Sequence, residues 1–355
     1  MRFLLDDGQR EFARALDGLL GSAGTPGVVR SWASGDHGPG RALWGRLAEA
    51  GVFGLAVPEE HQGLGPLPVE LAVAFGELGR HAVPGPLVET VAAGALLGRL
   101  GGDTARFWLP QLASGKAVAS LCVLAPGGSP YALDADAADA VFVVDGDTVR
   151  LAPSHGPVQP SADPARRLAR PLGAAVLEQG SSVEAAAAHA CDVAALATAA
   201  QALGLGRALL ERTVQYVRQR TQFGVAIGSF QAVKHRLADT LVALEFARPL
   251  VHAAALALAA DDPTAGREVA AAKVSACEAA YGAARTALQL HGAVGYTDEP
   301  DVSLWIRKAR PLRTAWGTPA VCRARVLAPH GRGEPRTHHL TRPSEAGPES
   351  PAPPP

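Results

Sequence analysis

The amino-acid sequence predicts a mostly α-helical fold with a small β region in the middle and a helical bundle after it. Three observations lead to this prediction. Apolar residues recur at helical spacing from residue 6 to about 117, short β-prone runs then alternate with turns, and long helical patterns return from about residue 183. The predicted parts are an N-terminal helical domain over 1–117, a reduced middle β domain over 118–182, a C-terminal four-helix bundle over 183–330 and a disordered, Pro-rich tail over 331–355.

The N-terminal region carries start and stop signals for several helices. Asp6 or Asp7 can cap a first helix, because a short acidic side chain accepts hydrogen bonds from the free N–H groups of the first turn. A second helix contains Leu43 and stops at Gly51, since glycine adopts the backbone conformation that ends helices. Two more helices are predicted over 69–80 and 85–100.

The middle region has the pattern of short strands. The β-prone runs cover 119–124, 140–144 and 147–151. Asp145, Gly146 and Asp147 stand between two of these runs, and Asp-Gly between apolar runs is typical of a tight hairpin.

The C-terminal region begins with long helices. One apolar stripe at a spacing of three to four residues predicts a helix of the bundle; it comprises Phe230, Val233, Leu237, Leu241 and Leu244. Helices over 265–291 and 301–316 complete a set of four antiparallel helices. Thr318 then caps a further helix, with Pro319 in its first turn.

The composition excludes several classes of function. A net charge of −1 over 355 residues gives no overall attraction for nucleic acid or an anionic membrane. The four cysteines lack the paired spacing of a metal or redox site, so we expect reduced, buried thiols and no metal. The N-terminus is too short and acidic for a signal peptide, and the apolar run 241–260 contains Glu245, Arg248 and His252. We therefore expect a soluble cytoplasmic protein.

Two motifs carry most of the information on function. The first is Arg220-Thr-Gln-Phe223-Gly224 followed by Phe230-Gln231, and the second is Gln289-Leu-His-Gly-Ala-Val-Gly-Tyr. With the segment from Trp44 to Gly63, in which a helix end leads into a Pro-Glu-Glu turn and a Gly-rich loop, they resemble the acyl-CoA dehydrogenases. These flavoenzymes desaturate fatty or steroid-side-chain thioesters. The resemblance covers most of residues 5–328 and implies their fold, with FAD as cofactor and an acyl-CoA thioester as substrate.

The resemblance also assigns residues to the flavin. It implies that the ADP half of an FAD bound mainly by a neighbouring subunit is held by Arg220, Phe223, Gln231, Gln289, Gly292 and Thr318. An arginine suits this role because its guanidinium contacts two oxygens of a pyrophosphate at once. The alternative is that Arg220 is a surface cation at a helix end and Gln289 caps a turn. Ala293 replaces the family's second glycine, which weakens the motif if that position needs a positive φ.

The base that the family needs is missing. Counting from Gln289, its usual position is occupied by Trp316, and the second position known in the family is occupied by Ala194. Nearby carboxylates are Asp192 and Glu245, which we expect to be a helix-start acid and a surface acid. Trp316 is expected to pack in the core and to plug the acyl pocket.

The middle region also departs from the family. The segment Leu121–Pro130 replaces the family's Thr-Glu-Pro strand, and no tryptophan occurs between residues 109 and 304, so we expect that the chain does not hold a flavin ring alone. Gly127-Gly128-Ser129 is interpreted as a turn and not as a phosphate loop. A basic run near the C-terminus is interpreted as a solvated or subunit-facing surface in preference to an anion site; it comprises Arg307, Lys308, Arg310, Arg313, Arg323 and Arg325.

Three hypotheses for function follow. In the first, the chain is the non-catalytic subunit of a heteromeric acyl-CoA dehydrogenase of lipid metabolism, such as a heterotetramer, and lends ADP-side contacts to a homologous catalytic subunit. In the second, it is a non-enzymatic scaffold or acyl-CoA-binding protein of the same fold. In the third, it forms a homo-oligomer that uses an unrecognised carboxylate such as Asp192.

Overall fold

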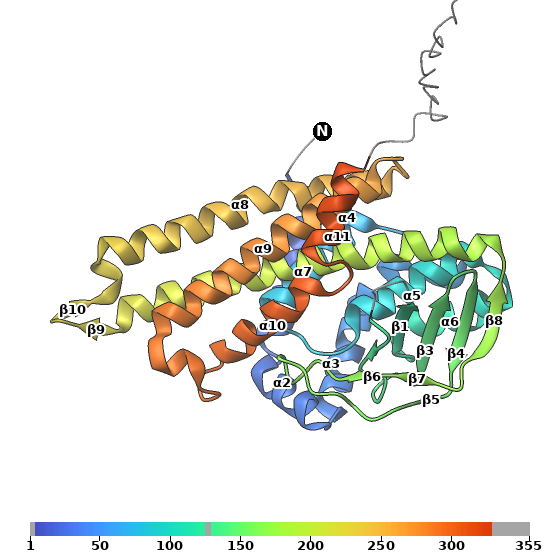
Figure 1. Ribbon diagram of the computed structural model, residues 1–355, viewed down its shortest axis with the longest axis horizontal. Coiled ribbons are helices and arrows are strands. Elements are labelled where there is room, and N and C mark those ends of the chain that lie inside the picture. Colours follow the sequence, from blue (N-terminus) through green and yellow to red (C-terminus); the bar gives the residue numbers. More distant parts are fainter. Residues whose placement is uncertain (1–3, 125–128, 329–355) are drawn as a thin grey trace, which may run out of the picture.

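The computed structural model describes residues 4–124 and 129–328, and it has the predicted architecture of N-terminal helices, a small sheet and a long helical bundle (Figure 1). The sheet lies at one end of the molecule, and the long helices extend away from it. The predicted tail over 331–355 and the predicted turn at 127–128 lie outside the described residues.

Six helices precede the sheet. They are α1 (Asp7–Gly21), α2 (Thr25–Ser34), α3 (Gly38–Glu49), α4 (Pro68–Arg80), α5 (Leu87–Leu100) and α6 (Gly102–Ala113), with short 3₁₀ turns at Val52–Ala56 and Glu59–His61. The predicted cap is confirmed, because the Asp6 carboxylate accepts a hydrogen bond from the Gln9 N–H at 2.8 Å. Helices α2 and α6 carried no signal of their own in the sequence analysis.

The sheet has four main strands in the order β1-β3-β4-β8. Their bounds are Ala119–Leu124, Ala140–Asp145, Thr148–Ala152 and Ala175–Gln179. Strands β3 and β4 form the predicted hairpin, in which Gly146 has a φ of 57°. The strand β1 is parallel to β3, and two short antiparallel pairs, β2 (Ala132–Leu133) with β6 (Leu168–Ala169) and β5 (Ser154–His155) with β7 (Pro171–Leu172), lie beside the sheet.

The bundle contains three long helices and two shorter ones. They are α7 (Ser181–Gln219), α8 (Gln231–Ala259), α9 (Ala265–His291), α10 (Val302–Thr314) and α11 (Pro319–Leu327). A hairpin of β9 (Thr221–Gln222) and β10 (Val225–Ala226) with a 3₁₀ turn (Ile227–Ser229) joins α7 to α8, and a second 3₁₀ turn (Gly292–Tyr296) follows α9. Because the helices alternate in direction, α7 and α9 both end beside this hairpin (Figure 1).

Close backbone packing joins the bundle to the N-terminal helices. A Cβ atom on Gly204 of α7 would lie 1.8 Å from the Gly76 carbonyl oxygen of α4, and one on Gly79 would lie 1.9 Å from the Gln201 carbonyl oxygen. Only glycine allows this approach. Helix α7 is therefore fixed against α4 and supplies a rigid wall for whatever lies on its other faces.

Helix α8 differs from the sequence interpretation. Leu244 is buried, but Leu241 is 48% exposed and Phe230 is 39% exposed, so the predicted stripe runs along the edge of the buried face. The outward face is itself apolar and carries Leu241, Val242, Phe246 and Leu250, with Phe246 at 74% exposure. We call these four residues the α8 apolar face.

Helices α7 and α8 are each long and apolar enough to cross a membrane by length and composition alone. The apolar window of α7 is 83% buried inside the protein, as expected for the core helix of a bundle, whereas that of α8 is only 33% buried. Charged residues Glu245 and Arg248 lie within α8 and form an ion pair at 3.2 Å.

A buried lysine binds the segment around the end of α10. The Lys273 side chain is 1% exposed, and its ammonium donates to the carbonyl oxygens of Leu312 at 3.1 Å and Gly317 at 3.3 Å. The predicted cap of α11 is confirmed, because the Thr318 hydroxyl accepts from the Val321 N–H.

Candidate functional site

Three of the predicted flavin ligands lie at the hairpin end of the bundle. Arg220 is exposed directly after α7, and its guanidinium has no partner among the described residues. Phe223 is 94% exposed with a φ of 52°, and Gly224 has a φ of 78°. Gln231 is exposed in the first turn of α8. The tight turn between β9 and β10 thus projects Phe223 away from the core. Arg220 lies at the base of the same hairpin, where it is also exposed.

Gln289 and Gly292 reach the same end from α9. The rings of His291 and Tyr216 stack with centroids 4.1 Å apart, which fixes the end of α9 against the end of α7. The Gln289 side chain is exposed and accepts a hydrogen bond from Arg236 of α8. Gly292 has a φ of 62°, but Ala293 is not among the described residues with positive φ. Alanine is therefore compatible with this backbone, and the replacement does not break the motif.

Thr318 lies apart from the other five residues. Helix α10 separates it from the end of α9, and a helix of 13 residues is about 20 Å long. Thr318 instead caps the start of α11, two residues after Trp316. The predicted set is thus divided between the hairpin end and the start of α11.

The hairpin end has the groups that a diphosphate ester needs. Arg220 supplies an uncompensated cation, and the exposed backbone at Gly224 and Gly292 allows close approach by a ligand. Gln289 adds an amide that is free to donate, because only its oxygen is bonded to Arg236. This donor set fits the ADP half of FAD, and its exposure places such a ligand at the surface of this chain.

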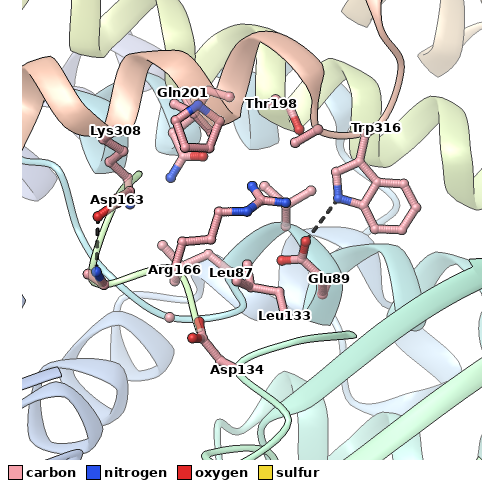
Figure 2. Close-up of a pocket in the computed structure, with 16 residues that line it drawn as sticks. Leu87, Glu89, Leu133, Asp134, Asp163, Arg166, Thr198, Gln201, Lys308 and Trp316 are labelled. Atoms are coloured by element: carbon pink, nitrogen blue, oxygen red, sulfur yellow. Dashed lines mark hydrogen bonds and ion pairs between the residues drawn. The ribbon is translucent and has the colours of Figure 1, made fainter. Parts of the chain in front are cut away.

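Trp316 lies in a cavity away from the hairpin end of the bundle. The cavity is enclosed by α5, α7, α10 and the loops of the β region, and Figure 2 shows its side chains converging from these segments. Trp316 has a φ of 53°, and its indole N–H donates to the Glu89 carboxylate oxygen Oε1 at 3.0 Å. Trp316, which the resemblance places at the family's base position, therefore makes a hydrogen bond with a carboxyl group 227 positions away.

Glu89 was not found by the sequence analysis. It is 4% exposed, and its second carboxyl oxygen, Oε2, has no hydrogen-bond partner. Burial raises the pKa of Glu89, although Arg166 and the Trp316 hydrogen bond oppose this. The available signal was a single acid in the otherwise uncharged segment Leu87–Gly98, which is uncommon in a buried helix.

Other ionisable groups line the same cavity. Burial raises the pKa of Asp134 to about 8, and Lys308 lies 3.8 Å from Asp163. Arg166 projects between Glu89 and Thr198 in Figure 2, without a side-chain partner among the described residues. The volume of the cavity is only about 30 Å³, which suits about one water molecule and not an acyl chain.

The second expected position of the base also adjoins this cavity. Ala194 is fully buried in α7, and its carbonyl accepts from the hydroxyl of Thr198, which lines the cavity. Both positions known in the family therefore lie close to one cavity, and neither carries a carboxylate.

The interpretation of Asp192 as a helix-start acid is wrong. Helix α7 begins at Ser181, so Asp192 lies in its fourth turn, where it is 8% exposed. Both of its carboxylate oxygens accept from Arg325 of α11, and it does not line the cavity. Glu245 pairs with Arg207 and Arg248 on α7 and α8, in keeping with a surface acid.

Most of the basic run is paired within the chain. The ion pairs are Arg307–Asp298, Lys308–Asp163, Arg313–Glu278, Arg323–Glu278 and Arg325–Asp192. These charges are compensated locally, which favours a structural role over an anion site.

One group of possible metal ligands appears among the described residues. Side-chain atoms of Asp17, Glu77 and His81 lie within 4.8 Å of one another. Asp17 already bonds His81 at 2.7 Å and lies 3.6 Å from the Arg80 guanidinium, so its charge is compensated without a metal ion.

Comparison with known proteins places this chain in a family. The family model described as acyl-CoA dehydrogenase, N-terminal domain, matches residues 6–116, and the C-terminal domain model matches residues 185–329. The acyl-CoA dehydrogenase IpdE2 of Mycobacterium tuberculosis is 36% identical over 294 residues, covering 82% of this chain and 87% of the relative.

Solved structures share the fold at low sequence identity. The ChsE4–ChsE5 complex from Mycobacterium tuberculosis contains a chain with a TM-score of 0.79 and 24% identity, covering 93% of this chain and 100% of that chain. A glutaryl-CoA dehydrogenase from Mycobacterium smegmatis, solved in complex with FADH2, has a TM-score of 0.78 and 18% identity, covering 91% of this chain and 94% of that chain. The chain belongs to the acyl-CoA dehydrogenase family.

Proposed function

We propose that this chain is the non-catalytic subunit of an FAD-dependent acyl-CoA dehydrogenase and lends ADP-side contacts to a homologous catalytic subunit. The observation that carries the proposal is the Trp316–Glu89 hydrogen bond in a cavity of about 30 Å³. An indole stands where the family has its base, and it fills the space that an acyl chain needs.

The chemistry explains why a partner is required. Desaturation of an acyl thioester removes the α proton with a base, while FAD, when bound, supplies the hydride acceptor. An indole nitrogen has no basic lone pair and donates its only N–H to Glu89. Proton removal therefore falls to a carboxylate on the homologous subunit.

The hairpin end is suited to a shared cofactor. Arg220 and Phe223 project from the surface, so a ligand that they contact is shared with whatever covers this end of the bundle. We assign Arg220 to the pyrophosphate and Gln289 with Gly292 to the ADP half of FAD held by the partner.

The α8 apolar face is the surface on which we place the partner. Exposed apolar clusters of this kind mark protein interfaces in soluble proteins. The ChsE4–ChsE5 complex, which shares the fold, has two named components. We therefore assign the partner to the same family and expect the product of an adjacent gene to supply it.

The test compares two neighbouring arginines. In a complex co-purified with the partner, Arg220→Ala is expected to lower the FAD content per complex by about tenfold, since a charge-assisted bidentate contact is lost. Arg218→Ala, which removes an exposed arginine two residues earlier, is the matched control and should leave the FAD content unchanged. Equal FAD content in the wild type and Arg220→Ala would refute the lending role.

A second candidate rests on Glu89 itself. Its buried carboxyl group in the cavity makes it a better base than Asp192, which is held by Arg325. If the isolated chain desaturates a thioester, Glu89→Gln should abolish turnover while retaining FAD. If activity requires the partner and survives Glu89→Gln in this chain, the second candidate is excluded. Ala293 does not favour the scaffold hypothesis, because it does not occupy a positive-φ position.

A further inference from the structure

A second cavity lies on the opposite side of α7 from Trp316. Its volume is about 250 Å³, roughly eight times that of the Trp316 cavity. Its walls come from α4, α5, α7, the end of α8 and the loop before α4; they include Leu55, Leu71, Ala95, Val193, Leu196 and Leu258. Its position and size make it independent of the proposed flavin contacts.

The walls of this cavity are apolar and preformed. The loop before α4 contributes Pro58 and Pro66, and α4 begins with Pro68; these prolines have fixed φ angles and no backbone N–H to donate to water. An apolar cavity of about 150 Å³ stays dry and accepts benzene in other proteins. A cavity of 250 Å³ is therefore expected to take up an apolar ligand in preference to water.

Three polar side chains line the cavity: Arg99, His189 and Asp261. Arg99 and Asp261 form an ion pair there, with side chains 47% and 74% exposed. An exposed pair of this kind contributes little to stability, so Arg99 can exchange its partner at little cost. His189 is half-buried beside them, and burial together with Arg99 lowers its pKa, so its neutral ring can donate one N–H.

We propose that this cavity is a binding site for a medium-chain aliphatic carboxylate, with the chain between α5 and α7 and the carboxylate at Arg99 and His189. The volume of 250 Å³ holds about eight groups of the size of a water molecule, at about 30 Å³ each, and a methylene group is close to that size. The ligand is therefore about eight carbons long. Asp261 turns to solvent when the carboxylate takes its place.

Calorimetric titration of the purified chain with octanoate tests this site. We expect saturable binding of one octanoate per chain, with 1-octanol at least about tenfold weaker because it cannot pair with Arg99. The same loss is expected for octanoate with Arg99→Gln. Arg106→Gln is the matched control, because Arg106 forms a similar exposed pair with Asp103 and does not line the cavity.

Filling variants locate the ligand. Ala95→Leu places three more carbons in the cavity and should abolish octanoate binding, with an unchanged far-ultraviolet circular dichroism spectrum to show that the chain is folded. Ala259→Trp, at an exposed position on the rim, is a second obstruction that leaves the core intact. Failure to observe saturable binding, equal affinity for 1-octanol, or binding that persists in both filled variants would each overturn the proposal.

Discussion

At the scale of single residues, the proposed function depends on the side chain at position 316, where the resemblance places the family's base. Trp316 is not a neutral filler, since its positive φ and its hydrogen bond to Glu89 hold the indole inside the cavity. Lys273 fixes the carbonyl of the next residue, Gly317, and so restrains the same segment from the other side. The substitution is thus integrated into the core and has become part of its polar network.

Replacement of Trp316 by Phe should destabilise the chain. An aromatic ring is retained, but the buried Glu89 carboxyl group loses the one side-chain donor that it has among the described residues, which costs about 1 to 3 kcal/mol. Urea unfolding gives the free energy of unfolding. Trp108→Phe is the control, because Trp108 is half-buried and its indole N–H has no partner among the described residues. Equal losses in the two variants would show that the hydrogen bond does not contribute.

Glu77 makes the stability of the chain depend on pH. Burial raises its pKa from 4.5 to about 7, with Asp17 and Glu211 contributing and Arg80 opposing. Because the folded pKa exceeds the unfolded one, this contribution is complete below about pH 4.5 and is lost as the pH rises through 7.

Glu77→Gln should therefore flatten the decline of the melting temperature between pH 5 and about pH 8. The comparison is with wild type and with Glu60→Gln, which removes an exposed glutamate in the 3₁₀ turn Glu59–His61. If the melting temperature of Glu77→Gln falls with rising pH as steeply as that of the wild type, the assignment of this pH dependence to Glu77 is contradicted.

At the scale of elements, α8 shows the limit of periodicity as evidence. Its sequence predicts a helix, and the helix is present, but apolar residues occupy both sides of it. The stripe from Phe230 to Leu244 follows the edge of the buried face, whereas the exposed Phe246 was not assigned to any surface. The apolar pattern of one sequence does not distinguish a helix face buried inside the chain from a face that binds another protein.

Phe246→Glu should weaken the association with the partner subunit by at least about tenfold and leave the monomer stable. A charge on the α8 apolar face would have to be buried at the interface, whereas in the free chain it remains in water. Size-exclusion chromatography with light scattering measures the complex. Phe107→Glu, at a residue 62% exposed on α6, is the control. Normal assembly of Phe246→Glu would remove α8 from the interface.

At the scale of the whole molecule, the sequence predicted the order of helices, sheet and bundle, because each has its own periodicity and turn residues. The hairpin at Gly146 and the caps at Asp6 and Thr318 are local features and were found for that reason. The cavity could not be predicted. It brings together Glu89, Asp134, Arg166, Thr198, Lys308 and Trp316, which only tertiary packing places side by side.

The most direct measurement compares the chain purified alone with the chain purified together with its homologous partner. Flavin absorbance and dye-coupled dehydrogenase activity with a saturated acyl-CoA are recorded for both. We expect the isolated chain to be colourless and inactive, and the mixed preparation to carry FAD and to turn over. An isolated chain that binds FAD and oxidises the thioester would contradict the proposal that this chain lends its contacts to a catalytic subunit.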